Sequence, residues 1–234
     1  MKHTLISLPW FAGLVALAIL TLATPALAGP PLICHPIDIG AAKSLPWTGT
    51  SWNLSGNEGY DTANLVRDTL ALLTSDTPVI VRMETLRRAT LYARKDPRAA
   101  KELLTRLHAR ATAAETTKSD PMTWFDVGYL TETYRQGLTS DRNPATGLDG
   151  YGFIKKALGL RSQILGSDDA EMEFAAALVT LHPPGPNHVR HAQKATAGAK
   201  VDDLLARNLA LHFLGNTNQT VAQALAGTTG GGEQ

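Results

Sequence analysis

Three times along the chain, a side chain that caps helices stands directly before a proline. The pairs are Thr77-Pro78, Asp96-Pro97 and Asp120-Pro121. A capping side chain accepts a hydrogen bond from a free amide of the first helical turn, and proline at the first helical position sacrifices no hydrogen bond. Each pair therefore predicts the start of a helix. Asp168 with Glu171 predicts another start, through a capping box.

Apolar residues recur with helical period after these starts. One face of the segment 97–115 carries Ala100, Leu103, Leu104, Leu107 and Ala111. Further helices are expected over 61–74 and 78–94, and the segment 172–181 is apolar nearly all round, which places it at the centre of the core. Glycines that favour helix ends stand at Gly137, Gly166, Gly198 and Gly215.

The helices group into four consecutive hairpins, at 61–94, 97–137, 149–182 and 186–215. Their spacing of about 35–45 residues is typical of helical solenoid repeats. The sequence therefore predicts an all-α fold, in which antiparallel helical hairpins stack as a right-handed solenoid-like array. This α-helical domain is expected to span 61–227.

One stretch resembles a known repeat family. The resemblance is to tetratricopeptide repeats and rests on Trp124-Phe125-Asp126-Val127-Gly128-Tyr129-Leu130, with Ala-rich neighbours such as Ala99-Ala100. The aromatic residue that the family has three positions after the glycine is replaced by Thr131. The resemblance implies an α-α array whose concave surface binds another macromolecule or a peptide.

The first 28 residues have the form of a cleaved export signal. A short basic start precedes an apolar run from Leu5 to Leu22, and Ala26-Leu27-Ala28 matches the small-x-small pattern that signal peptidase cuts. We therefore expect residues 1–28 to be removed, leaving a periplasmic or secreted protein without a stable membrane anchor. The alternative is an uncleaved anchor, because the apolar run is near the lower length limit for crossing a bilayer.

The mature chain is expected to be formally neutral. The whole sequence contains 22 Lys and Arg against 21 Asp and Glu, and cleavage removes Lys2. This balance provides no general attraction to nucleic acid, so no nucleic-acid partner is expected. The single cysteine, Cys34, excludes an internal disulfide and a cysteine-rich metal cluster. We expect neither a metal nor another cofactor.

Residues 29–60 are expected to form an irregular arm rich in Pro and Trp, and residues 228–234 a disordered Gly-rich tail. The arm carries the candidate binding residues, which are Cys34, His35, Asp38, Trp47 and Trp52. Buried tryptophans contribute much of the free energy of protein interfaces, so the arm predicts an anchor for a protein or peptide. The alternative is that the two tryptophans close one end of the helical array.

Two clusters support an alternative function as an enzyme or a metal-binding protein. Cys34 would act as a nucleophile if a distant histidine, such as His108 or His212, folded back onto it. The second cluster is His182, His188 and His191. Three neighbouring imidazoles are a ligand set for zinc or copper. Neither cluster matches a known catalytic pattern, so both are expected to be structural.

A charge-rich turn interrupts the apolar helix expected over 78–94. It consists of Arg82, Glu84, Arg87 and Arg88. Glu84 and Arg88 are spaced i,i+4, and we expect them to form a surface pair worth about 0.2–0.5 kcal/mol. The turn is therefore interpreted as a solvated face rather than as a receptor for a carboxylate or phosphate.

Together, these features predict an exported helical-repeat protein that acts as a non-enzymatic scaffold and binds a protein or peptide. The alternative is an enzyme or metal-binding protein that uses Cys34 or the cluster His182, His188 and His191. A third interpretation is a purely structural envelope protein, which would self-associate without a discrete ligand.

Overall fold

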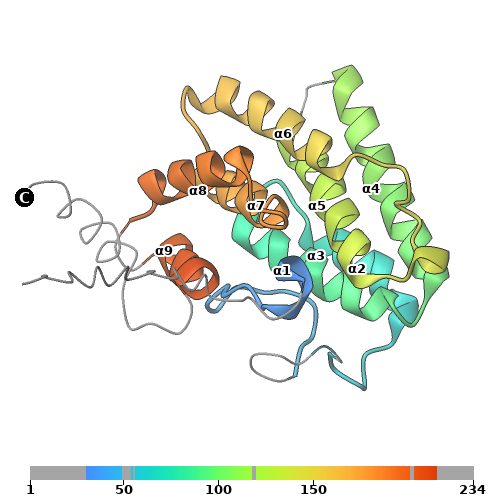
Figure 1. Ribbon diagram of the computed structural model, residues 1–234. Coiled ribbons are helices and arrows are strands. Elements are labelled where there is room, and N and C mark those ends of the chain that lie inside the picture. The colour runs from blue at the N-terminus through green and yellow to red at the C-terminus, as the bar shows by residue number, and fades with distance from the viewer. Residues whose placement is uncertain (1–29, 49–53, 55, 118–119, 201–202, 215–234) are drawn as a thin grey trace, which may run out of the picture.

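The structure is a computed structural model that describes residues 30–48, 54, 56–117, 120–200 and 203–214 (Figure 1). Helices make up the regular structure of these residues, and no strand occurs among them. The prediction of an all-α fold is therefore confirmed. None of the helices in these ranges is long and apolar enough to span a bilayer. The predicted leader, Trp52 and the predicted tail lie outside the described residues.

The helices of the described ranges follow one another in a simple order. They are α1 (Pro31–Cys34), α2 (Leu65–Leu72), α3 (Val79–Ala93), α4 (Pro97–Thr117), α5 (Pro121–Gly137), α6 (Gly150–Leu165), α7 (Ala170–Val179), α8 (Pro186–Gly198) and α9 (Leu204–Leu209). Short 3-10 turns, η1 (Thr62–Asn64) and η2 (Ser140–Arg142), precede α2 and α6, and a π-helical turn, η3 (Ala210–Leu214), follows α9.

A helix starts at each of the three acceptor–proline pairs as predicted, and two of the pairs also supply the predicted cap. Asp96 accepts hydrogen bonds from the first amides of α4, and Asp120 accepts one from the amide of Met122 in α5 at 2.9 Å. The cap predicted at Thr77 is wrong, because its hydroxyl donates to the carbonyl of Leu72 instead of capping α3. A tertiary contact supplies the missing cap, since the carboxylate of Glu171 accepts from an amide in the first turn of α3 at 3.3 Å.

Only some of the start and end signals predicted for α5 to α8 act as predicted. Asp169, rather than the predicted Asp168, caps α7 by accepting from the amide of Met172 at 3.1 Å. Gly166 ends α6 with φ +70°, in the left-handed conformation expected of a terminal glycine. Gly137 and Gly198 are the last residues of α5 and α8 and do not adopt that conformation. Gly215 lies outside the described residues.

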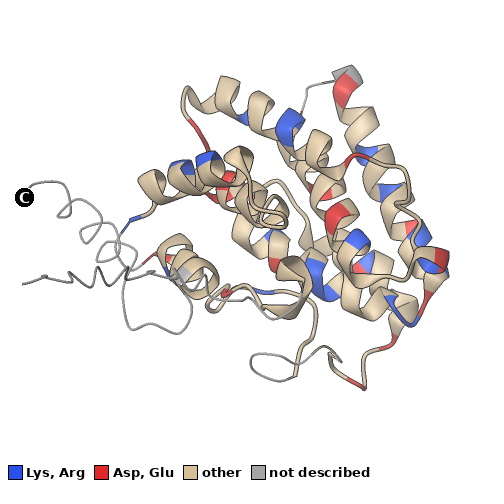
Figure 2. Cartoon of the chain, viewed as in Figure 1, with Lys and Arg blue, Asp and Glu red and all other residues tan. Residues whose placement is uncertain are grey.

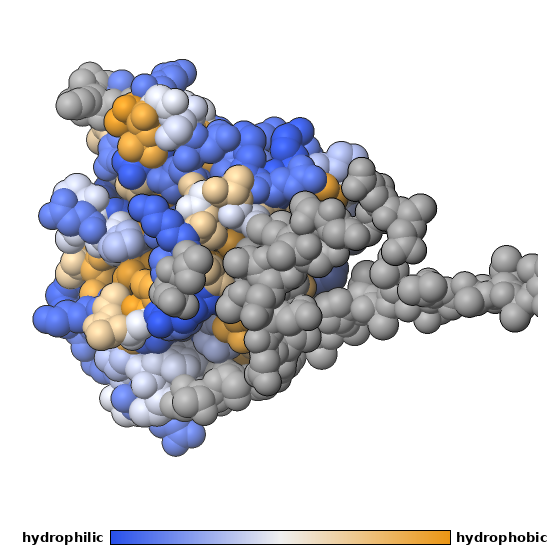
Figure 3. All heavy atoms as spheres, turned by 90° about the vertical axis from the view of Figure 1, so that its left-hand side faces the viewer, coloured by the Kyte–Doolittle hydropathy of each residue, from blue (hydrophilic) through white to orange (hydrophobic). Residues whose placement is uncertain are grey.

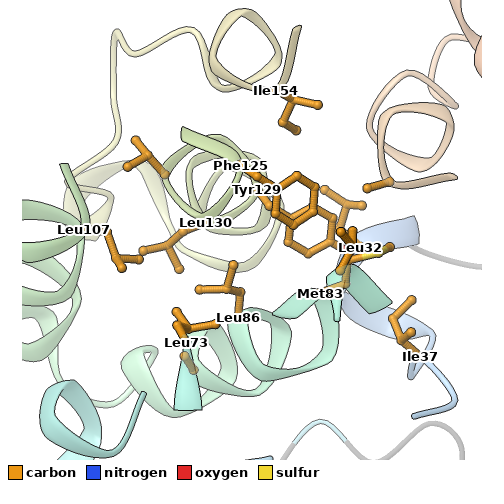
Figure 4. Close-up of a cluster of buried hydrophobic side chains, with 14 of the residues drawn as sticks. Leu32, Ile37, Leu73, Met83, Leu86, Leu107, Phe125, Tyr129, Leu130 and Ile154 are labelled. Atoms are coloured by element: carbon orange, nitrogen blue, oxygen red, sulfur yellow. The ribbon is translucent and has the colours of Figure 1, made fainter. Parts of the chain in front are cut away.

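Helix α5 lies at the centre of the fold and packs against α3, α4 and α6 (Figure 1). Every residue from Pro121 to Tyr134 is buried. In the close-up of the core, Phe125 and Tyr129 of α5 lie beside Leu32 of α1 and Met83 of α3 (Figure 4). Helix α7 is also buried, from Met172 to Leu178, which confirms the prediction made from its apolar sequence.

The N-terminal arm packs onto this core over its described part. Its apolar side chains at Leu32, Ile33, Ile37, Ile39 and Leu45 are buried, and the short helix α1 contacts α3, α5 and α7. The amide of Leu32 donates to the side chain of Gln136 at 2.9 Å, which ties α1 to the end of α5. The arm therefore belongs to the folded domain along residues 30–48.

Candidate functional site

The charge-rich turn of α3 lies beneath the arm, so the prediction of a solvated face is wrong. The side chains of Glu84 and Arg87 are fully buried, and that of Arg88 is 17% exposed. Glu84 Oε1 accepts from Arg87 Nη1 at 3.1 Å and from Arg88 Nε at 2.7 Å. The predicted i,i+4 pair therefore forms, but in the interior and with a third partner.

The same three side chains bind the backbone of the arm. The bonds run from Ile37 N to Glu84 Oε2 (2.9 Å), from Arg87 Nε to Ile33 O (2.9 Å) and from Arg88 Nη1 to Leu45 O (2.7 Å). An irregular segment cannot satisfy its own amides and carbonyls as a helix does, and buried groups left unpaired are costly. The ionic turn of α3 therefore provides the partners that let the arm fold against the core.

A second buried ion pair joins α3 to α5. Arg82 Nη1 lies 2.7 Å from Asp126 Oδ2, and both side chains are almost fully buried. Arg82 also donates to the carbonyls of Thr74 and Thr77, in the loop before α3. Burial raises the pKa of Asp126 to about 6, although the guanidinium of Arg82 opposes that shift. The pair therefore positions a loop and two helices, while Oδ1 of Asp126 is buried without a hydrogen-bond partner.

The predicted binding residues of the arm make separate intramolecular contacts. Asp38 pairs with Arg207 of α9 at 3.0 Å and exchanges two backbone hydrogen bonds with the side chain of Asn208, each 2.8 Å long. Trp47 is half-buried, with the guanidinium of Arg87 5.3 Å from its ring centroid and an edge-on contact with Tyr92. These contacts link the arm to α3 and to α9.

Cys34 and His35 lie at the end of α1 and are half-buried. His212, which follows α9, folds back onto this part of the arm, and its ring meets that of His35 at a centroid distance of 5.8 Å. Burial lowers the pKa of His212 to about 3, and the neighbouring His35 and Arg87 act in the same direction. His108 lies elsewhere, against the rings of Trp124 and Phe153.

The histidines of the predicted second cluster have different partners. His188 Nδ1 lies 2.8 Å from the carbonyl of Ala177, whereas His191 contacts the carboxylate of Glu173. Among the residues that the structure describes, no group of three or more His, Cys, Asp or Glu side chains is arranged to hold a metal ion.

His191 instead forms the middle of a hydrogen-bonded chain across three helices. Its Nε2 lies 2.8 Å from the hydroxyl of Tyr151 in α6, and its Nδ1 makes a short contact with Oε2 of Glu173 in α7. The side chains of His191 and Glu173 are only 6% and 3% exposed, whereas Tyr151 is half-buried. These hydrogen bonds therefore lead from the buried carboxylate of Glu173 to the half-buried hydroxyl of Tyr151.

Several charged groups surround this chain. Lys194 of α8 donates to Oε1 of Glu173 at 3.2 Å and to Asp168 at 3.0 Å. Lys155 of α6 lies over the ring of Tyr151, 5.0 Å from its centroid. Burial raises the pKa of the Tyr151 hydroxyl, while the neighbouring Arg190 favours its ionised form. A lysine therefore lies at each end of the hydrogen-bonded chain, Lys155 over the ring of Tyr151 and Lys194 at the carboxylate of Glu173.

Sequence reasoning included His191 but missed Tyr151, Glu173 and Lys194. One signal was present, because Glu173 is a carboxylate within a helix that the sequence predicts to be buried all round. A buried carboxylate needs a hydrogen-bonded partner. Tyr151 carried no comparable signal, since its position in the first turn of α6 does not show which residue of another helix it meets.

A shallow groove lies between the η1–α2 segment and the start of α4. It has a volume of about 460 Å³. Val66 and Leu70 line it and are half-buried, and Ala99 is buried. Charged residues also line it, namely Arg67, Asp96, Arg98, Glu102 and Arg106. Acidic and basic residues are interspersed along these outer helices (Figure 2).

Large apolar side chains are exposed at four described positions away from that groove. They are Ile164, Leu165, Val189 and Leu211. On the face that corresponds to the left-hand side of Figure 1, apolar patches lie between hydrophilic ones (Figure 3). Single exposed apolar residues are normal on soluble domains, so these four do not by themselves mark a site.

Comparison with known proteins gives no family for this chain. No protein-family model matches it, and no curated protein or solved structure shows significant similarity to it.

Proposed function

We propose that this protein is an exported helical domain that binds a segment of another protein or a peptide in the groove between α2 and α4. The single observation that carries the proposal is the composition of this groove, where apolar side chains are flanked by exposed charged ones. Peptide-recognition grooves commonly combine an apolar floor, which provides affinity, with charged positions that provide specificity.

The floor and the rim favour a particular kind of ligand. Val66 and Leu70 provide an apolar surface to cover, whereas the side chains of Arg67 and Arg106, which pair with Asp68 and Glu102, are 73% and 64% exposed. Asp96 lines the same groove, but its carboxylate already accepts two amides of α4. A segment with an apolar anchor beside carboxylates would therefore match the groove best.

The arm has a supporting role in this proposal. Buried charges of α3 bind its backbone, and this contact fixes the inner helix against which α2 and α4 pack. That Cys34, His35, Asp38, Trp47 and Trp52 contact a partner stays a prediction. The array of stacked antiparallel hairpins of the tetratricopeptide type is part of the same proposal. The packing of α5 on α6 and of α7 on α8 joins successive predicted hairpins and supports their stacking.

A photo-crosslinking experiment tests the groove. A photoreactive amino acid replaces Leu70 in the groove, and a matched variant carries it at Thr105, which is exposed on α4 but does not line the groove. In the native envelope, we expect Leu70 to capture a reproducible partner and Thr105 not to. Arg98→Glu, added to the Leu70 variant, should abolish the capture. Equal capture from both positions, or capture insensitive to Arg98→Glu, would contradict the proposal.

A further inference from the structure

The Tyr151–His191–Glu173 chain has the order of a nucleophile, a base and an orienting carboxylate. An ionised carboxylate only accepts hydrogen bonds, so the Nδ1 of His191 carries the hydrogen toward Glu173. In the neutral ring, Nε2 then has a free lone pair and accepts the O–H of Tyr151 at 2.8 Å. This is the relation by which an imidazole prepares a hydroxyl for attack.

We propose that Tyr151 is the nucleophile of a phosphoryl-transfer site, with His191 as its general base and Glu173 as a positioning residue. The inference goes beyond the proposed binding function and does not depend on it, because the α2–α4 groove and this chain share no residue.

The cations around the hydroxyl favour a phosphate ester as the substrate. Arg190 favours the negative charge of the Tyr151 oxygen, while the carboxylates of Glu173 and Asp149 oppose it, and Lys155 lies 5.0 Å from the centroid of the same ring. A phosphoryl group in transfer carries negative charge on its non-bridging oxygens, and arginine and lysine stabilise that charge. An uncharged acyl ester would gain less from the same surroundings.

The proposed step conserves atoms and charge. The oxygen of Tyr151 attacks the phosphorus of R–O–PO₃²⁻, an O–P bond forms, and the bond from phosphorus to the leaving oxygen breaks. The proton of Tyr151 passes to Nε2 of His191 and then to the leaving oxygen, which departs as R–OH. Water later attacks the tyrosyl phosphate, releases inorganic phosphate and restores the hydroxyl, with His191 taking and returning the proton.

Glu173 acts through His191 and has a second contact that holds it in place. Lys194 binds its other oxygen at 3.2 Å and also binds Asp168, so the carboxylate is fixed between α7 and α8. A fixed carboxylate keeps the imidazole in the tautomer that leaves Nε2 free. The same hydrogen bonds would hold the three helices together if their role were purely structural. The reactivity of Tyr151 is what distinguishes a catalytic role from a structural one.

A labelling experiment on the unmodified mature chain makes this separation. An aryl sulfonyl fluoride reacts with an activated tyrosine by forming an O–S bond and expelling fluoride. Tyr60 is the internal control, because it is also half-buried and its hydroxyl donates to a carboxylate, of Asp68, at 2.9 Å. General-base assistance should make Tyr151 react roughly a hundredfold faster than Tyr60, as followed by peptide mass spectrometry. Equal rates would overturn the proposal.

Two variants test the roles of the other residues. His191→Asn should slow the labelling of Tyr151 roughly a hundredfold and leave that of Tyr60 unchanged. Glu173→Gln should slow it less and shift its pH profile, a change that a structural contact alone would not produce. Circular dichroism checks that each variant is folded. If the labelling of Tyr151 is unchanged in a folded variant, the proposed role of that residue is wrong.

Chromogenic esters test the substrate class. With p-nitrophenyl phosphate, we expect release of nitrophenol and a phosphate bound to Tyr151, both absent in Tyr151→Phe, which removes only the hydroxyl. With p-nitrophenyl acetate, little release is expected. Preference for the acetate, or labelling of Tyr151 without any phosphoryl transfer, would overturn the phosphate assignment. Loss of capture in the α2–α4 groove would leave these results untouched.

Discussion

The inner helix α3 and the outer helix α4 each carry a Glu–Arg pair at i,i+4, in opposite surroundings. In α3, the carboxylate of Glu84 is fully buried and binds Arg88 at 2.7 Å. In α4, Glu102 and Arg106 are 54% and 64% exposed and lie 3.4 Å apart. Spacing along a helix therefore predicts which side chains meet. How much their contact contributes to the free energy of unfolding depends on the segment that covers them.

Glycines show the same contrast between α5, which is inner, and α6, which is outer. A Cβ on Gly128 of α5 would lie 2.7 Å from the carbonyl oxygen of Gly150 and 2.9 Å from the amide of Ile154. A Cβ on Gly159 of α6 would meet nothing within 4 Å. One glycine therefore permits two helices to approach, whereas the other has no packing role.

The largest expected effect is the loss of the buried carboxylate. Glu84→Ala leaves the guanidinium of Arg87 buried without its counter-ion and removes the partner of the arm amide at Ile37, so it should cost about 3–5 kcal/mol of unfolding free energy. Glu102→Ala, the matched control on α4, should cost at most about 0.5 kcal/mol. Urea denaturation measures both, and equal costs would show that burial does not distinguish the pairs.

The next prediction concerns the pH dependence of stability. It depends on His212, a residue of the C-terminal part of the described chain that lies near the buried Arg87. The pKa of His212 is about 3 in the folded protein against an ordinary 6.5, so the unfolded chain binds the proton more readily. The contribution of His212 to stability is therefore complete above about pH 6.5 and is lost as the pH falls toward 3. At about 1.4 kcal/mol per pH unit, roughly 3 kcal/mol should be lost by about pH 4.

The control for this prediction is His212→Met. Methionine also fills the space beside Phe174 with a large side chain, but it cannot bind the proton. The unfolding free energy of the natural protein should fall below that of the variant as the pH is lowered. Parallel curves for the two proteins between about pH 6.5 and 4 would contradict the assignment.

Local signals in the sequence predicted most of the helices. The caps at Asp96 and Asp120 and the glycine at Gly166 act as expected, because each depends only on residues within a turn or two. The cap predicted at Thr77 is wrong because Glu171, from a helix far along the sequence, accepts from the first turn of α3 instead. The sequence around Thr77 does not indicate that a distant carboxylate will provide the cap.

The candidate sites were predictable to a smaller extent for the same reason. The sequence predicted a solvated face at Glu84 and Arg87, because it does not show that the arm lies over that side of α3. His191 was singled out, but its partners Tyr151 and Glu173 come from two other helices. Charged residues in an otherwise apolar helix are the signal that would have indicated both clusters.

Gly128→Ala should weaken the contact between α5 and α6. The added methyl group meets backbone atoms of α6, which cannot move aside as a flexible side chain would, so the helices must separate. We expect a loss of about 1–3 kcal/mol, because overpacking at a buried contact outweighs the gain in helix propensity. Thermal and urea denaturation measure the change, and a neutral result would show that the two helices are less closely packed.

Gly159→Ala should have the smallest effect and the opposite sign. The position is exposed in the middle of α6, and the added methyl group meets no neighbouring atom. Alanine restricts the unfolded chain more than glycine does, so the substitution should stabilise the protein by about 0.5–1 kcal/mol. If Gly128→Ala and Gly159→Ala change stability in the same direction, the distinction between inner and outer helices does not hold for α5 and α6. Opposite signs from one chemical change would trace the difference to packing alone, since both glycines lie within helices.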